Sequence, residues 1–507
     1  MAEIRPDTVT NSGSREREPA KLPGGATPRL KRALRFRDLT LFYIVTALSV
    51  RWVATAAAAG PSALLVWGFA LIGFFVPLAV SVLELSSRYP QEGGLYVWTR
   101  EAFGDFAGFL SAWMYWMSNL PYFPSILYFG AGSLLFAAGA RGHRFAASPA
   151  YFMSFAVVWL AIITLVNIVG LDAGKWLNNI CSVGSWLPIL ILIALAGASW
   201  TRFGAATHFS AAAFVPHLSL KNAIFWSTIF FAFGGCETGS FMGEEIENPR
   251  RTIPRALLVS GVVLALGYVA GTAALLVALP PGDVSGVDGF MHGAAQLCSR
   301  FGMMWLAVVL AVLLTLNAVG GAASFLSSTS RLPFVAGIDL YLPPVFGRVH
   351  PRFRTPWVAI GVYGLAGMVV AALGQAGTTV RGAYDVLVSM GIITYFIPYL
   401  FLFAAMARVQ GRPAEAGVLR VPGGKPVALG LAALGFVSTA VTIVLSVIPA
   451  EEEPDKTLAV AKVLLSTLLV VGSGIAVFAV ARRKRAMYLA VGGAMETGQS
   501  DADRGRA

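Results

Sequence analysis

The stretch ALSVRWVATAAAAGP (Ala47–Pro61) places an arginine inside the first strongly apolar segment of the chain. A charged side chain at the centre of a bilayer costs about 2.5–3.5 kcal/mol on insertion scales, so we expect it to be paired, hydrated or functional. Ser49, Arg51 and Trp52 interrupt the apolar pattern, and a Gly-Pro pair closes the segment. The stretch therefore predicts a broken transmembrane helix, with Arg51 beside the break.

The composition around this segment is that of a membrane protein. Of the 507 residues, 56% are hydrophobic and only 13% are charged, which is too apolar for a soluble protein of this size. Apolar windows of about 20 residues, long enough to span a bilayer, recur along the chain, and their continuous apolarity excludes a β-barrel. We predict an all-α membrane protein with twelve transmembrane helices, at 40–58, 62–86, 106–137, 150–170, 176–199, 222–246, 254–280, 303–328, 356–374, 383–407, 427–449 and 459–481.

Basic residues indicate how these spans are oriented. They precede the first predicted span, follow the last one, and gather in the even-numbered loops. The positive-inside rule then places both termini in the cytoplasm, for a protein of the plasma membrane or the bacterial inner membrane. The expected organisation is a disordered cytoplasmic tail at 1–38, a transport domain at 39–482 and a cytoplasmic tail at 483–507. Because the net charge of +12 is distributed over short loops, we expect membrane lipid and no nucleic acid as partners.

Motifs for enzymatic chemistry are missing from the sequence. The three cysteines and five histidines are scattered, without the spacing of a metal site or a disulfide framework. There is no nucleophile elbow, no HExxH motif and no phosphate-binding loop of an ATPase. We therefore expect a protein that is not an enzyme, has no cofactor and binds no metal.

The predicted sixth span, 222–246, contains a second break. The sequence IFFAFGGCETGSFMGEEIENPRRTIP (Ile229–Pro254) has Gly234-Gly235 in mid-span and Glu237 two residues later. Each glycine is less favourable in a helix than alanine by about 1 kcal/mol. Unpaired backbone at membrane depth is tolerated only where it lines a cavity or a protein interior. A close helix–helix contact is the alternative explanation for the glycine pair.

Breaks in spans one and six have the spacing expected of two inverted repeats, here 39–200 and 221–407, followed by two extra helices at 426–481. Transporters built in this way bind their substrate near the bilayer midplane, at the interface between the repeats. We therefore predict a small-molecule substrate between the two breaks. A channel is disfavoured, because paired breaks indicate a closed midplane site rather than a continuous pore.

Three long segments resemble the amino acid–polyamine–organocation (APC) superfamily of permeases. They are ELSSRYPQEGGLYVWTREAFGDFAGFLSAWMYW (Glu84–Trp116), FFAFGGCETGSFMGEEIENPRRTIPRA (Phe230–Ala256) and RLPFVAGIDLYLPPVFGRVHPRFRTP (Arg331–Pro356). The first span has SVRWVATAA in place of the usual glycine-rich break, which resembles the branch of glutamate:GABA antiporters. The resemblance implies a LeuT-type 5+5 inverted repeat plus two C-terminal helices. It also implies secondary active transport of an amino acid or related amine, by exchange or alternatively by proton-coupled symport.

The resemblance also implies roles for individual residues. Phe231, six positions before the sixth-span glutamate, matches the aromatic gate of these permeases, although any phenylalanine in a span can simply face lipid or core. Glu237 matches a glutamate proposed to couple protons, and a structural pairing with Arg51 is the alternative. The substrate-binding residues expected around the two breaks are Ser49, Val50, Arg51, Trp52, Phe233, Gly234 and Gly235.

The role of Arg51 is left open between two functions. Several relatives carry a lysine in span five that replaces a sodium ion, and Ser185 stands at that position here. Arg51 is therefore either a fixed cation replacing sodium, which the missing lysine favours, or a counter-ion for a substrate carboxylate. Snorkelling to the cytoplasmic interface is disfavoured, because Arg51 lies about a dozen residues, or ~18 Å, into the span.

Other polar and aromatic side chains in the spans have two interpretations each. Asn317 and the serines of span eight are either remnants of a sodium site or packing residues. The aromatic residues of span three either line the substrate site or form part of an interfacial belt; they are Trp113, Tyr115, Trp116 and Tyr122. The sequence does not determine the exact substrate or the oligomeric state.

Overall fold

The apolar stretches fold as helices because a segment in hydrocarbon must satisfy its backbone hydrogen bonds internally. Local signals set some of the boundaries. For example, Pro149 occupies the first turn of its helix, and the Ser148 side chain accepts a hydrogen bond from the Tyr151 N–H. The computed structural model describes residues 30–216, 225–226, 229–284, 288–374, 380–413, 417–448 and 456–504.

The N-terminal half contains α1 (Phe36–Ala47), α2 (Val50–Ala58), α3 (Ser62–Ala70), α4 (Val76–Arg88), α5 (Leu95–Phe103), α6 (Asp105–Ser118), α7 (Tyr122–Ala137), α8 (Pro149–Val169), α9 (Leu171–Phe203) and α10 (Ala211–Phe214). The C-terminal half contains α12 (Pro249–Ala278), α13 (Gly289–Arg300), α14 (Met304–Thr329), α15 (Arg331–Ile338), α16 (Trp357–Gly374), α17 (Val380–Val409), α18 (Gly424–Val447) and α19 (Lys456–Arg504). A π-helical turn, Leu71–Phe75, joins α3 to α4, and the 3-10 helix η3 (Thr238–Glu245) precedes α12.

The predicted membrane spans are recovered in large part. Within the described residues, nine helical segments are long and apolar enough to cross a membrane, and two shorter apolar helices, Trp357–Leu373 and Ile393–Val409, accompany them. The predicted span at 222–246 lies partly outside the described residues. The long predicted span at 106–137 consists of α6 and α7, with a turn between them that contains Pro121.

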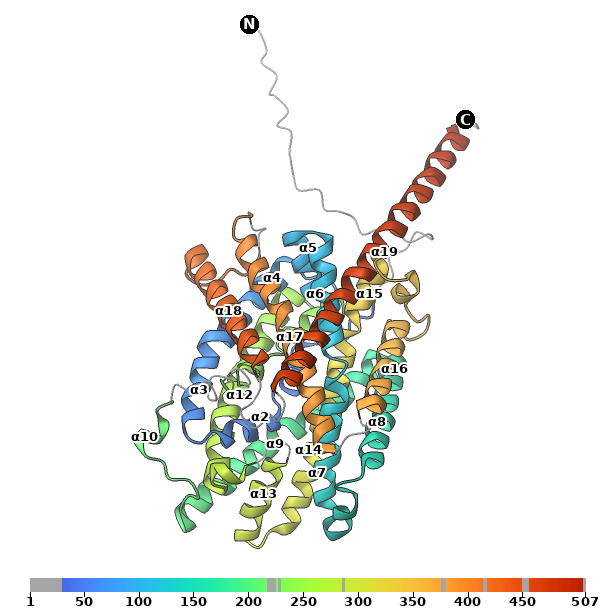
Figure 1. Cartoon of the computed structure of the whole chain (residues 1–507). Helices are drawn as coiled ribbons and strands as arrows, with labels where there is room; N and C mark the ends of the chain where they lie inside the picture. Colours follow the sequence, from blue (N-terminus) through green and yellow to red (C-terminus); the bar gives the residue numbers. More distant parts are fainter. Residues whose placement is uncertain are drawn as a thin grey trace.

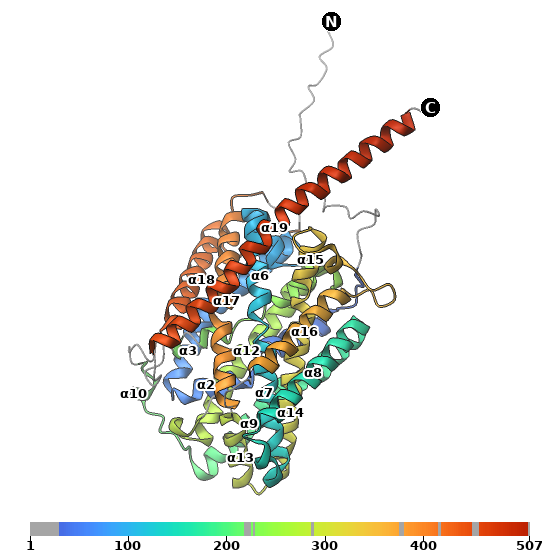
Figure 2. The ribbon, with the colours of Figure 1, turned by 45° about the vertical axis from the view of Figure 1, so that its right-hand side comes forward.

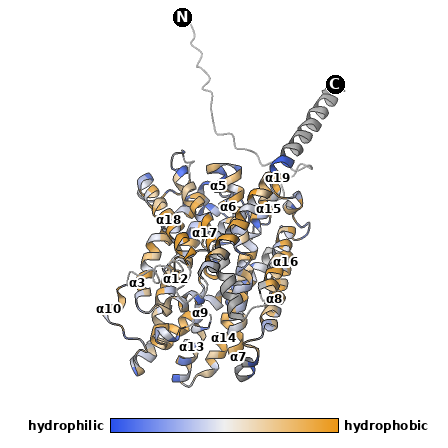
Figure 3. Cartoon of the chain, viewed as in Figure 1, coloured by the Kyte–Doolittle hydropathy of each residue, from blue (hydrophilic) through white to orange (hydrophobic). Residues whose placement is uncertain are grey.

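The helices form one bundle with two polar ends. Figure 1 shows α5, α15 and the C-terminal part of α19 at one end, and α10 and α13 at the other. Apolar colours cover the middle of the helices in Figure 3, and hydrophilic colours gather towards both ends. Helix α19 runs along the outside of the bundle (Figure 2), where it packs against α6 and α17. We call the end that carries α5 and α15 the terminus side.

The boundaries of the two predicted tails differ from the structure. Residues 1–29 lie outside the described residues, but Leu30 and Leu34 are buried and Leu34 forms a β-bridge with Ile246. The packed chain therefore includes part of the predicted tail at 1–38, because two leucines among its basic residues pack against the bundle. At the other end, α19 continues through the predicted boundary at 483 to Arg504.

A buried charge cluster lies at the terminus side of the bundle. Arg331, at the start of α15, pairs with Glu245 at the end of η3 through two hydrogen bonds, Nε to Oε2 at 3.0 Å and Nη2 to Oε1 at 2.9 Å. The Glu92 carboxylate, between α4 and α5, lies 3.7 Å from Arg331 Nε. All three side chains are at most 5% exposed. We call these three residues the Arg331 cluster.

The cluster predicts an effect of pH on stability. Burial and the neighbouring Glu245 carboxylate raise the pKa of Glu92 above its usual range. A carboxyl group with a raised folded-state pKa stabilises the fold at low pH, and this stability is lost as the pH rises through that pKa. We expect the wild-type melting temperature to rise as the pH falls from about 8 to about 5. Glu92→Gln should flatten this rise, whereas Glu101→Gln on α5 should not. Identical melting profiles for Glu92→Gln and wild type would contradict the expectation.

Candidate substrate-binding site

The first break separates α1 from α2. Leu48 and Ser49 adopt extended backbone conformations, and α2 begins at Val50. The break thus lies slightly before the predicted position, and Arg51 and Trp52 belong to the first turn of α2. No glycine is needed here, because extended φ and ψ angles are available to any residue.

The second break follows Phe231. Residues 232–237 form successive turns before η3 begins. Gly235 has φ +105°, which only glycine adopts readily. A Cβ atom on Gly234 would lie 2.8 Å from the Tyr395 ring, so this glycine also allows a close approach. The predicted glycine break is therefore present, although residues 222–224 and 227–228 of that span lie outside the described residues.

Tyr268 of α12 connects the two breaks. Its hydroxyl lies 2.5 Å from the carbonyl oxygen of Ala47 and 3.0 Å from that of Ala232, and it accepts a hydrogen bond from the Ser49 N–H at 3.2 Å. The ring stacks on Trp67 at a centroid distance of 4.4 Å. Sequence reasoning missed Tyr268, because a tyrosine in an apolar span carries no signal of its own.

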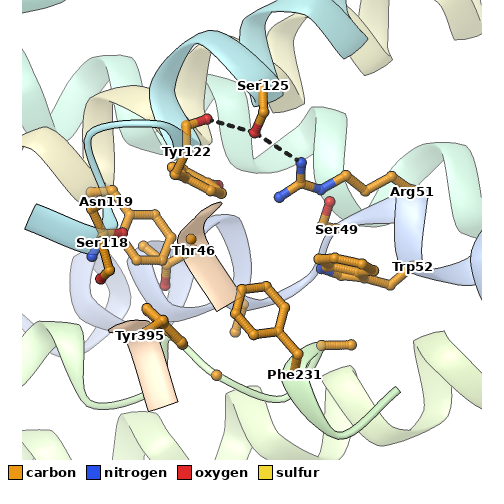
Figure 4. Close-up of a pocket in the computed structure, with 15 residues that line it drawn as sticks. Thr46, Ser49, Arg51, Trp52, Ser118, Asn119, Tyr122, Ser125, Phe231 and Tyr395 are labelled. Atoms are coloured by element: carbon orange, nitrogen blue, oxygen red, sulfur yellow. Dashed lines mark hydrogen bonds between the residues drawn. The ribbon is translucent and has the colours of Figure 1, made fainter. Parts of the chain in front are cut away.

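A pocket lies where the two breaks meet (Figure 4). The α1–α2 break, the α6–α7 turn, the second break, α14 and α17 all contribute to it. Its lining residues are Thr46, Ala47, Ser49, Arg51, Trp52, Ser118, Asn119, Tyr122, Ser125, Phe231, Ala232, Gly234, Phe325, Gly391 and Tyr395.

The pocket contains some of the predicted residues and not others. Ser49, Arg51, Trp52, Phe231 and Gly234 line it, whereas Val50, Phe233, Gly235 and Glu237 are buried outside the lining. Phe233 packs against the rings of Trp67, Phe75 and Tyr268 instead. The lining residues that sequence reasoning missed include Thr46, Ser118, Asn119, Ser125 and Tyr395.

Two of these residues show why the sequence alone did not identify them as part of the pocket. Asn119 lies in the α6–α7 turn and Ser125 in the first turn of α7, and nothing in the sequence indicates that these residues face the first break. Of the four span-three aromatics, Tyr122 lines the pocket. Trp113 instead donates a hydrogen bond to the Val470 carbonyl of α19.

Arg51 is buried, with 3% of its surface exposed, and it faces the pocket. Its Nη1 lies 3.5 Å from Ser125 Oγ, and its guanidinium carbon lies 4.8 Å from the Trp52 ring centroid and 5.3 Å from that of Tyr122. Within the described part of the chain, Nε has no hydrogen-bond partner and Arg51 forms no ion pair. An unpaired cation is expensive at membrane depth, so we expect Arg51 to have a functional role.

Phe231 separates the pocket from the neighbouring aromatic core. Its ring centroid lies 5.3 Å from Trp52, 5.0 Å from Tyr395 and 5.5 Å from Phe396, with edge-to-face geometry in each case. Figure 4 shows Phe231 between Trp52 and Tyr395 at one side of the pocket. This position is compatible with a gate whose rotation opens or covers the site.

Glu237 lies behind the lining rather than in it. It is fully buried and accepts hydrogen bonds from the Tyr115 hydroxyl, the Gly235 N–H at 3.1 Å and the Tyr395 hydroxyl at 3.4 Å. Among the described residues it forms no ion pair with Arg51, so the geometry does not support the alternative role as a structural partner of that arginine. Tyr395 touches both the pocket and Glu237, and therefore links the carboxylate to the site.

A neutral amide lies beside the first break. Asn317 of α14 donates from Nδ2 to Ser185 Oγ at 2.6 Å and to the Leu48 carbonyl oxygen at 3.5 Å. Asn317 thus contacts a carbonyl that the break leaves unpaired, whereas the Arg51 side chain contacts Ser125 on α7.

Comparison with known proteins gives the family. The sequence profile of amino acid permeases matches residues 34–473. An uncharacterised transporter of Legionella pneumophila is 27% identical over 84% of this chain and 92% of its own length. A probable agmatine/putrescine antiporter of Lactococcus lactis is 23% identical over 72% of this chain and 78% of its own, and a branched-chain amino acid permease of Bacillus subtilis is 27% identical over 80% and 86%. The chain therefore belongs to the amino acid permease family of the APC superfamily, which implies a LeuT-type fold and a multi-pass membrane transporter of amino acids or polyamines rather than an enzyme.

Proposed function

We propose that this protein exchanges an amino acid or a related amine across the membrane by alternating access. The observation that carries the proposal is the pocket at the meeting point of two helix breaks, where helix ends offer backbone amides and carbonyls to a zwitterion. Among the relatives, one is named as an antiporter and another as an amino acid permease. The relation to the glutamate:GABA antiporter branch is part of this proposal.

The topology belongs to the same proposal. The two breaks begin repeats at 39–200 and 221–407 that face opposite ways in the membrane, and the helices at 426–481 are additional to them. Both termini lie in the cytoplasm of a plasma membrane or bacterial inner membrane, in agreement with the basic residues at the two ends of the predicted transport domain. The terminus side of the bundle is then its cytoplasmic side.

Flux measurements test the exchange. Purified protein in liposomes should take up a labelled amino acid or amine when unlabelled substrate is present inside, and should take up little when the vesicles are empty. A symporter would instead require a proton gradient, and a channel would require neither. Uptake that is indifferent to internal substrate would overturn the proposed exchange.

Phe231→Ala should lower the exchange rate about tenfold, because the aromatic contacts that cover the site are worth about 0.5–1.5 kcal/mol each. Stability should change less than transport, since the ring is only half-buried. Phe69→Ala is the matched control, because Phe69 on α3 is 60% exposed and belongs to the lipid-facing surface. If Phe231→Ala exchanges substrate at the wild-type rate, Phe231 is not the gate.

Proton-coupled symport is the alternative function, and the link from Glu237 through Tyr395 to the pocket favours it. Glu237→Gln removes the ionisable group while keeping a similar shape. If the glutamate couples protons, uptake driven by a proton gradient should be lost in this variant, while exchange of substrate for substrate should persist. Equal loss of both activities would assign Glu237 a structural role.

A further inference from the structure

Helix α19 presents most of its surface to lipid. Its segment Leu464–Arg485 is long and apolar enough to cross a membrane, and only 11% of its most apolar 18-residue window is buried inside the protein. The exposed apolar side chains include Leu465, Leu468, Leu469 and Val480. At 1.5 Å per residue, the 22 residues of this segment extend over about 33 Å, close to the ~30 Å thickness of the hydrocarbon layer. We therefore expect the end of the segment to lie at the membrane surface.

That end carries four consecutive basic residues, Arg482–Arg485. The first three, Arg482, Arg483 and Lys484, are exposed, and within the described residues none of their side chains forms a hydrogen bond or an ion pair. We call these three the outer basic residues. In Figure 3 the hydrophilic colour on α19 lies where the helix leaves the bundle. By contrast, Arg331 at the same end of the protein is buried and paired with a carboxylate.

The fourth basic residue, Arg485, faces the bundle. Its Nη1 lies 3.1 Å from Asp105 Oδ2 at the start of α6 and donates a hydrogen bond to the Tyr341 hydroxyl, which follows α15. Phe478, two turns earlier on α19, stacks on the Tyr341 ring at a centroid distance of 5.0 Å. Residues seven apart share one face of a helix. This face attaches α19 to the bundle, and the outer basic residues lie on the remaining, exposed surface.

The position of the outer basic residues determines which anion suits them. A ligand there must carry negative charge at the boundary between hydrocarbon and water. The phosphate of a phospholipid lies at this depth, and its acyl chains can pack on the apolar surface that leads up to the basic residues. An anionic phospholipid has no cationic headgroup to offset its phosphate, and each Lys or Arg near the membrane surface strengthens its binding about fivefold.

We propose that Arg482, Arg483 and Lys484 bind the headgroup phosphate of an anionic phospholipid, whose acyl chains lie along the exposed apolar surface of α19. This lipid site is separate from the pocket between the two breaks and does not depend on which substrate is transported. The bound lipid holds the end of α19 at the membrane surface. Arg485, on the next residue, connects that end to α6 and to the residues after α15.

Lipid binding to the purified full-length protein tests the proposal. In a non-ionic detergent, with bound lipids counted by native mass spectrometry, phosphatidylglycerol should bind at least tenfold more tightly than phosphatidylcholine. Neutralising all three outer basic residues to Gln should weaken phosphatidylglycerol binding at least tenfold and leave phosphatidylcholine within about twofold. Arg485→Gln alone should weaken it less than threefold, because this side chain faces the protein. Thermal unfolding without added lipid checks that each variant is folded.

The matched control removes the same charge elsewhere at the terminus side. It replaces three exposed arginines of the loop before α16 with Gln and should change phosphatidylglycerol affinity less than twofold; they are Arg348, Arg352 and Arg354. An equal loss in the two triple variants would show a response to net charge alone and would overturn the proposal. Equal binding of the two lipids, or displacement of phosphatidylglycerol by millimolar inorganic phosphate, would also overturn it. A loss in Arg485→Gln as large as in the outer triple variant would place the anion on the wrong face of α19, with the same consequence.

Discussion

Arg331→Met is expected to destabilise the protein by about 3–5 kcal/mol, which is the cost of removing one partner of a buried ion pair. The substitution leaves Glu245 without its two charged hydrogen bonds, and it leaves Glu92 beside that carboxylate without a nearby cation. Thermal unfolding of the detergent-purified protein measures the effect, and exchange in liposomes should fall because the contact between η3 and α15 is weakened.

The matched control removes both charges. Arg331→Met combined with Glu245→Met replaces the pair with apolar side chains of similar length, and it should recover much of the lost stability. If the single and double variants unfold at the same temperature, then the cost arises from packing of Arg331 and not from the unpaired carboxylate. A single variant as stable as wild type would contradict the expectation altogether.

Tyr268→Phe is expected to reduce exchange by about 30-fold or more while the helices remain folded. Loss of the hydroxyl leaves the Ser49 N–H and at least one buried carbonyl without a partner, at about 1–3 kcal/mol for each group. These groups belong to the two breaks, so we expect their loss to change the geometry of the pocket. The steady-state rate of exchange and the affinity for substrate should both change.

Tyr363→Phe provides the comparison for Tyr268→Phe. The Tyr363 hydroxyl is also buried and donates to a carbonyl, that of Trp116 at 2.8 Å, but it does not touch the breaks. A similar loss of stability in both variants, with loss of exchange only in Tyr268→Phe, would establish a positioning role. Equal exchange by both variants would show that the breaks keep their geometry without the hydroxyl.

The sequence allowed both breaks to be predicted, because each carries a local signal. Gly234-Gly235 is unfavourable in a helix, and Arg51 is unfavourable in a bilayer, so each residue marks a departure from a simple span. The exact position of the first break could not be predicted. The chain departs from helical geometry at Leu48 and Ser49, which have no special backbone requirement. The backbone groups freed there are hydrogen-bonded by the Tyr268 hydroxyl, which comes from a helix distant in sequence.

The remaining lining residues depend on tertiary packing. Ser125 and Tyr395 are ordinary residues in apolar segments, and they become part of the site because α7 and α17 approach the two breaks. The same holds for Asn317, for which the sequence allowed two interpretations, a remnant of a sodium site or a packing residue. Its amide bonds Ser185 and Leu48, a contact between three segments that no local pattern encodes.

The Arg331 cluster should also affect the rate at which the protein reorients across the membrane without bound substrate. Glu245 ends the segment after the second break, and Arg331 begins the helix after α14, so a movement that separates these two segments would break the ion pair. Without a ligand to offset that cost, the empty protein is expected to reorient slowly. Net efflux into a medium free of substrate should therefore be much slower than one-for-one exchange. The protein would then deplete the internal substrate pool only slowly.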